Sequence, residues 1–319
     1  MEKVRAFLAR KNITFSAKRY FIDAMSAMAQ GLFCTLLVGT ILDTIGKQFG
    51  IGFLTDTFLT IKQGDVTFYY TIGGFCSLMV GPAMAVAIGK ALEAPPLVLF
   101  SLITVGFATN VLGGTGGPLA VFFVAILAAE VGKAISKETK INILVTPIVT
   151  ILAGIGFAAL VARPIGTAAT SVGDAIKWAT ELQPFFMGIL VSVIIGVALT
   201  LPISSAAICA SLGLTGLAGG AAVAGCCAQM VGFAVMSFRE NRWGGLVAQG
   251  IGTSMLQMGN IVRNVRIWIP PTPVSYTHLD VYKRQAAGPP DSTGFRTGRW
   301  GAPRSALRFS ASAAYGRKR

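Results

Sequence analysis

The chain has 319 residues, of which 53% are hydrophobic and only 13% are charged, and it contains 38 glycines. This composition is too apolar for an ordinary soluble domain, and the long apolar stretches between residues 21 and 260 are too many for a signal peptide to explain. Half of the net charge of +14 lies in the last 46 residues and the rest mostly flanks apolar runs, so the sequence carries no nucleic-acid footprint.

Residues 1–20 alternate apolar side chains with six basic ones, which is typical of an amphipathic helix lying on a membrane surface. Lys and Arg concentrate in the cytoplasmic segments of membrane proteins. The pattern therefore predicts a cytoplasmic N-terminus. A second basic loop, with Lys133, Lys137 and Lys140, is also expected in the cytoplasm, which is consistent with four membrane crossings between the N-terminus and this loop.

Long apolar runs predict the transmembrane helices, because about 20 apolar residues are needed to cross a bilayer. An amphipathic stretch at 164–182 follows the fifth run, and the sequence GGTGGP at 113–118 breaks the chain between the third and the fourth. The predicted spans are 21–46, 68–92, 96–112, 119–135, 141–164 and 184–203.

Small residues dominate the stretches 204–228 and 244–255. Small side chains let helices pack closely in lipid, and dense glycine also permits broken or re-entrant segments where protein or water covers the backbone. The fold class expected is an all-α polytopic membrane protein with about seven to eight transmembrane or re-entrant helical segments, after an N-terminal amphipathic helix.

From about residue 274 the apolar pattern stops abruptly. The stretch VSYTHLDVYKRQ back-translates as an inverted repeat, TCTCTTATACACATCT answered by AGATGTGTATAAGAGA, which resembles two transposon-type sequencing-adapter ends joined head to head. We expect residues 1–273 to form one membrane domain and residues 274–319 to be a non-native, disordered tail. His278, the one histidine of the sequence, is then no functional site.

No cofactor or metal is expected. All five cysteines lie in apolar segments without a CxxC pair or a nearby histidine, so we expect them to be small buried hydrophobic residues.

The break at 113–118 is the sharpest functional signal. Half-helices around a break can aim backbone dipoles and free amides at a substrate, and Asn110 and Thr115 add neutral donors and acceptors that suit a sugar. An extracellular turn between two ordinary spans is the competing interpretation.

Two further polar residues are candidates. Glu130 is a carboxylate inside an apolar run, where such groups are often functional, although pairing with Lys133 would also explain it. Gln229 lies in the small-residue region, where it either lines a polar cavity or bonds across helices. The predicted substrate path is lined by Asn110, Thr115 and Glu130 around the break and by Gln229.

Three stretches resemble the membrane subunit, enzyme IIC, of the bacterial phosphoenolpyruvate-dependent sugar phosphotransferase system, in the divergent branch that includes toxin-gene regulators. They are TGGPLAVFFVAILAAEVGK, TPIVTILAGIGFA and GTSMLQMGNIVRNVRIWIPPT. The resemblance covers about residues 1–273. It implies a homodimeric helical domain of the bacterial inner membrane that binds a sugar in a mid-membrane cavity, for phosphorylation by a separate IIB subunit supplied by IIA.

The chain departs from the better-known branches of this family, because residues 1–273 hold neither their cavity histidine nor their GITE-like glutamate motif. No catalytic residue is predicted, since the phosphoryl-transfer residue belongs to IIB. Two alternatives are an ion-coupled secondary transporter, which would need a membrane-embedded acid such as Glu130, and a membrane sugar sensor that regulates without transport.

Overall fold

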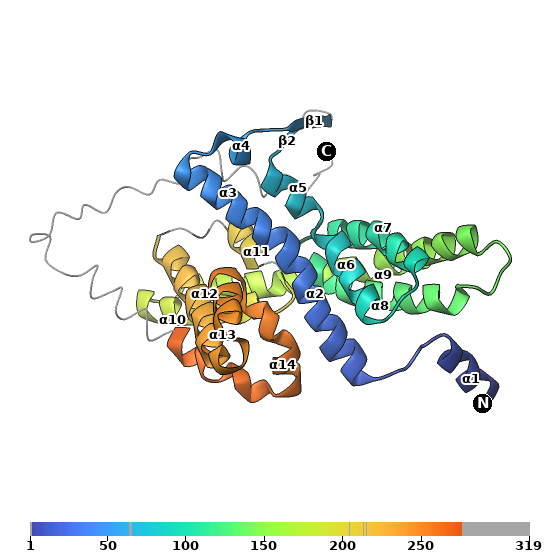
Figure 1. Ribbon diagram of the computed structural model, residues 1–319. Helices are drawn as coiled ribbons and strands as arrows, with labels where there is room; N and C mark the ends of the chain where they lie inside the picture. Colours follow the sequence, from blue (N-terminus) through green and yellow to red (C-terminus); the bar gives the residue numbers. More distant parts are fainter. Residues whose placement is uncertain (1, 64–65, 204, 213, 215, 276–319) are drawn as a thin grey trace, which may run out of the picture. The chain divides into compact units, whose positions relative to one another are not determined.

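The computed structural model describes residues 2–63, 66–203, 205–212, 214 and 216–275 (Figure 1). The chain divides into two compact units, which are described separately. Unit 1 contains residues up to 167 together with 255–265, and unit 2 contains the described residues of 168–254 and 266–275. The predicted tail, and His278 with it, lies almost wholly outside the described residues.

The predicted all-α polytopic class is confirmed. Among the described residues, four helical segments are long and apolar enough to cross a membrane: Lys18–Phe49, Pro96–Ile135, Asn142–Thr180 and Gly216–Met236. A fifth candidate is the pair α5 (Ile72–Leu78) and α6 (Val80–Ala91), which is bent by 50°.

Unit 1 begins with the amphipathic helix α1 (Glu2–Arg10). The first long segment then runs through α2 (Ala24–Leu32) and α3 (Val38–Phe49), each preceded by a π-helical stretch, η1 (Lys18–Asp23) and η2 (Phe33–Leu37). The short helix α4 (Gly52–Thr55) follows.

An antiparallel hairpin, β1 (Leu59–Gln63) and β2 (Val66–Tyr70), was not predicted. The second span was expected to begin at Phe68, but Phe68 to Tyr70 lie in β2 and the helix begins at Ile72. The reason is local, because β-branched and aromatic residues are concentrated in 66–71 and favour extended backbone.

Helices α6, α7 (Pro96–Gly113) and α8 (Gly117–Ile135) lie side by side in unit 1 (Figure 1). Gly81 of α6 and Gly106 of α7 bring the two backbones together. A Cβ atom on either glycine would clash with the carbonyl oxygen of the other. Glycine at this crossing lets two apolar helices gain van der Waals contact without an intervening side chain.

The α7–α8 segment folds back on itself. Gly117 faces Asn110 and Gly132 faces Val98, so the two helices are antiparallel. The reversal occurs in the 3-10 turn η3 (Gly114–Gly116), where Gly114 has φ +52, a backbone conformation that favours glycine. The predicted break is therefore a tight turn between two helices.

Helix α9 (Asn142–Thr180) is longer than expected. A span ending at Pro164 was predicted, followed by a separate amphipathic stretch, but the helix continues through Pro147 and Pro164. Interior prolines each remove one backbone hydrogen bond, but membrane helices tolerate them, and the alanine-rich sequence after Pro164 favours continuation of the helix. The amphipathic pattern is real, since Ile176 and Ala179 are buried in the core of unit 2 while Asp174 and Lys177 are exposed.

In unit 2, α10 (Pro184–Thr200), α11 (Ser205–Leu212) and α12 (Gly216–Met236) pack around Val191, Ile195 and Ile208. Gly225 of α12 touches the backbone of Ser192 on α10, which is a second close glycine crossing. The helices α13 (Phe238–Val247) and η4 (Ala248–Gly252) complete this stretch. The chain then returns to unit 1 through most of η5 (Ser254–Gln257) and all of α14 (Met258–Arg263). It enters unit 2 again in η6 (Val265–Trp268).

The close crossing in unit 1 can be tested with Gly106→Ala. The added methyl has no space against Gly81, so the backbones must separate, and we expect unfolding free energy to fall by roughly 1–3 kcal/mol. Gly156→Ala is the matched control, because nothing lies within 4 Å of a Cβ at Gly156 on α9. Thermal unfolding in detergent measures both, and equal melting temperatures would contradict the crossing.

Candidate functional site

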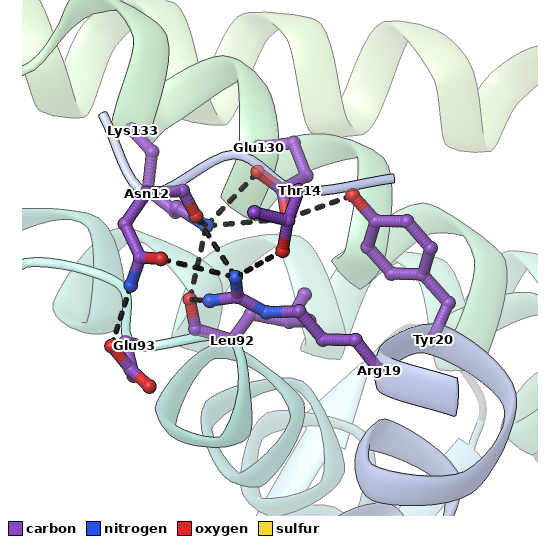
Figure 2. Close-up of polar contacts among 8 residues, drawn as sticks. All are labelled: Asn12, Thr14, Arg19, Tyr20, Leu92, Glu93, Glu130 and Lys133. Atoms are coloured by element: carbon purple, nitrogen blue, oxygen red, sulfur yellow. Dashed lines mark hydrogen bonds and ion pairs between the residues drawn. The ribbon is translucent and has the colours of Figure 1, made fainter. Parts of the chain in front are cut away.

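A buried ammonium group organises one end of α8 (Figure 2). The Lys133 side chain is only 1% exposed. Its Nζ donates to the carbonyl oxygens of Asn12 (2.8 Å) and Leu92 (3.0 Å) and to Glu130 Oε1 (3.2 Å). One cation therefore holds the N-terminal segment, the α6–α7 loop and α8 together.

Glu130 completes this ion pair, with its side chain 13% exposed. Tyr20 Oη donates to the same Oε1 at 3.1 Å. The second oxygen, Oε2, lies 3.0 Å from Lys133 Nζ but forms no hydrogen bond. An ammonium has three N–H groups, and Lys133 already uses one for each of its three acceptors. The pairing of Glu130 with Lys133, which the sequence left open, is thus present.

Arg19 forms a second layer beside Lys133 (Figure 2). Its Nη1 donates to Asn12 O and Oδ1 and to Thr14 Oγ1, and its Nη2 donates to Leu92 O at 2.6 Å. Asn12 Nδ2 in turn donates to Glu93 Oε2 at 2.5 Å. Asn12 and Glu93 both have positive φ, so two tight turns meet at this point.

Two further ion pairs extend the cluster to the α8–α9 loop. Glu138 Oε1 lies 2.6 Å from Arg10 Nη2 and 2.5 Å from Lys11 Nζ. The hydrogen bond from Lys11, reinforced by the charge of Arg10, lowers the pKa of the Glu138 carboxyl below its ordinary value. Lys11 Nζ also donates to the backbone oxygen of Ser136.

Asn110 and Thr115 lie at the opposite end of α8 from Glu130. They flank the turn between α7 and α8 and are half-buried, and Asn110 packs against Gly81 and Gly117. Fifteen residues separate Thr115 from Glu130, which is about 22 Å along a helix. The expectation that Glu130 sits around the break is therefore wrong in position, because a continuous helix carries it away.

Gln229 lies in unit 2 and is fully buried. Its Nε2 donates to Thr272 Oγ1 at 3.3 Å, while its Oε1 has no hydrogen-bond partner. Nearby, Trp268 Nε1 donates to Thr200 Oγ1 (3.3 Å), and Ser192 Oγ donates to Ser275 O (2.6 Å). A short polar network therefore joins α10 and α12 to the segment after η6.

A groove of about 910 Å³ runs along α12 in unit 2. It is lined by residues of α12 from Gly216 to Met236 and by Pro270, Pro271 and Val274, nearly all of them apolar. None of the four predicted site residues lines it. A wall without hydroxyls, amides or charges does not suit a sugar, which needs both donors and acceptors.

The sequence did not reveal the residues that form hydrogen bonds around the candidate side chains. Tyr20, Arg19 and Asn12 surround the Glu130–Lys133 pair, and Trp268 and Thr272 lie beside Gln229. The nearest signal was the spacing of three between Glu130 and Lys133, which indicated a pair but none of the distant residues around it.

The cysteines and the metal-ligating types of side chain are spread along the described residues. Within the described ranges, no group of three or more His, Cys, Asp or Glu side chains could hold a metal ion. The cysteines were expected to be buried, but Cys34 and Cys227 are exposed. Apolar neighbours in the sequence do not decide whether a helix face turns inward.

The fold and these polar clusters define a polytopic helical membrane protein. A sequence model of the phosphotransferase system EIIC family matches residues 22–277, well over half of the chain. The chain therefore belongs to the phosphotransferase system EIIC family, and the predicted resemblance is confirmed. It is a membrane subunit of a sugar phosphotransferase permease and works with IIA and IIB components. No curated protein and no solved structure gave a match.

Lys133→Met tests the buried ion pair. Removing the ammonium leaves the Glu130 carboxylate without its cation, with only the Tyr20 hydroxyl as a donor, and breaking a buried pair costs about 3–5 kcal/mol. We expect a correspondingly lower melting temperature in detergent, with partial recovery in the Glu130→Gln/Lys133→Met double variant. The exposed Lys140 provides the control, Lys140→Met, for which a change within about 0.5 kcal/mol is expected.

The Glu138 contact predicts a local pH dependence. Folding lowers the pKa of Glu138 from its ordinary value of 4.5. The contact therefore stabilises the docked N-terminal segment fully at pH values above 4.5, and this stabilisation is lost as the pH falls through the lowered pKa. The hydrogen-exchange protection factors of residues 2–12, which correct for the intrinsic exchange rate at each pH, should therefore fall between about pH 6 and pH 3. Glu138→Gln should exchange faster at pH 6 and respond less to acid, and an unchanged profile would contradict the assignment.

Proposed function

We propose that this chain is the sugar-translocating IIC subunit, which binds a sugar within the membrane and holds it while a separate IIB subunit donates a phosphoryl group. The observation that carries the proposal is the EIIC family match over residues 22–277. Residues 1–273 contain no histidine, which agrees with a phosphoacceptor on IIB. A homodimer in the bacterial inner membrane is part of the same proposal.

The cluster around Lys133 supports a cytoplasmic N-terminus. Its ion pairs bring α1, with Arg10 and Lys11, beside the α8–α9 loop, which also carries Lys137 and Lys140. These basic residues thus belong to one face of unit 1. Since Lys and Arg are concentrated in cytoplasmic loops, we assign this face to the cytoplasm.

The length of α8 indicates how deep in the membrane the turn at 113–118 lies. Its 19 residues span about 28 Å, close to the thickness of the hydrocarbon core. This length favours a turn near the outer surface over a break at the membrane centre. We therefore propose Asn110 and Thr115 for the outer mouth of the sugar path, Glu130 for its cytoplasmic end, and Gln229 for the part of the path in unit 2.

Transport coupled to phosphorylation has a distinctive product. In membrane vesicles holding this chain, a sugar should appear inside only as its phosphate, and only when phosphoenolpyruvate, the general phosphotransferase proteins, IIA and IIB are all present. Omitting IIB is the control, and it should abolish uptake. Uptake by the wild type should not depend on a pH gradient, and we expect the same of Glu130→Gln.

Two outcomes would contradict the proposal. Accumulation of free sugar without IIB, lost in Glu130→Gln, would indicate an ion-coupled transporter. Saturable sugar binding without any flux would indicate a sensor that regulates without transport.

A further inference from the structure

The side chain of Gln229 is buried in unit 2 with half of its hydrogen-bonding capacity unused. The residue is 0% exposed, and Nε2 donates to Thr272 Oγ1 while Oε1 accepts nothing. Leaving a buried amide oxygen without a donor is costly, so such an atom needs an explanation.

The neighbouring hydroxyls cannot supply the missing proton. Thr272 Oγ1 donates its proton to Trp268 O at 2.7 Å. Thr200 Oγ1 accepts from Trp268 Nε1 and donates its own proton to Gly196 O at 3.2 Å. Each hydroxyl has one proton, and both are committed. The network is therefore closed everywhere except at Gln229 Oε1.

We propose that the Gln229 amide is a hydroxyl-binding subsite of the sugar path, and that the Thr272 hydroxyl occupies the position of a substrate hydroxyl in this conformation. The inference rests on the proposed function. A carboxamide presents a donor and an acceptor side by side, which matches two adjacent sugar hydroxyls, one accepting and one donating. Thr272 satisfies the donor half alone.

The segment that carries Thr272 borders the apolar groove on one side. The strap, residues 268–272, contains Pro270 and Pro271, which lack backbone N–H groups and so cannot be held by backbone donation. Both prolines line the apolar groove on α12, and Ile269 is 63% exposed. Open space therefore borders the strap on one side. On the other side Pro271 is buried against Gly232 of α12, and side-chain hydrogen bonds involving Gln229, Trp268 and Ser275 hold the strap in place.

This arrangement makes Thr272 a competitor of the sugar. Thr272→Val keeps the shape of the side chain but removes the hydroxyl, so the Gln229 amide becomes available. The wild-type strap must break one hydrogen bond before the sugar binds, and the free energy of such a bond corresponds to a factor of about 2–10 in affinity. A purely structural role for Thr272 predicts no such gain.

The test is sugar binding to the purified full chain in detergent. The probes are radiolabelled glucose, mannose, galactose, fructose, glucitol, galactitol, maltose and cellobiose, measured by equilibrium dialysis. For a sugar that the wild type binds, we expect Thr272→Val to bind about 2–10-fold more tightly and Gln229→Met to bind at least about 10-fold more weakly, because the bound hydroxyls lose their amide partner. Thr150→Val is the matched control, since that buried hydroxyl donates only within its own helix in unit 1.

The outcomes separate the subsite from the proposed function. Unchanged binding by Gln229→Met overturns the subsite and leaves the proposed function standing. Weaker or unchanged binding by Thr272→Val overturns the competition, and a gain cannot arise from misfolding. A wild type that recognises none of the eight sugars overturns both the subsite and the proposed function.

Discussion

The buried ammonium of Lys133 is the constraint on which unit 1 depends. A charge removed from water is tolerated only when its hydrogen-bonding groups are all satisfied. Here the three acceptors come from three parts of the chain, namely Asn12, Leu92 and Glu130. The position of the N-terminal segment is thereby coupled to the α6–α7 loop and to α8, and Arg19 strengthens the same junction through Leu92 O.

Glycine residues hold the helix interfaces together, as Lys133 holds the loops together. Gly81 and Gly106 in unit 1, and Gly225 against Ser192 in unit 2, let backbones touch where a methyl group would not fit. Between apolar helices in lipid there is little hydrophobic gain, so close van der Waals contact supplies the attraction. The high glycine content thus has a direct packing role in both units.

The polar groups of the two units differ in how completely they are satisfied. Around Lys133 every donor of the ammonium has an acceptor, which suits a rigid junction. Around Gln229 one buried acceptor, Oε1, is open, and Thr272, which accepts from the Nε2 of the same amide, sits on a strap bordered by a groove. The proposed function uses both properties, because sugar transport combines a rigid frame with a site that exchanges an internal hydrogen-bond partner for substrate.

The sequence by itself determined the membrane class, the approximate helices from Pro96 to Thr200, the interruption at 113–118 and the family. These features depend on apolar runs, on prolines at helix starts and on glycines at a turn, all of which act over a few residues. Tertiary structure decided which polar groups meet. Tyr20 reaches Glu130 from 110 positions away and Thr272 reaches Gln229 from 43. Such pairs depend on how whole helices pack, and local periodicity carries no information about the partner.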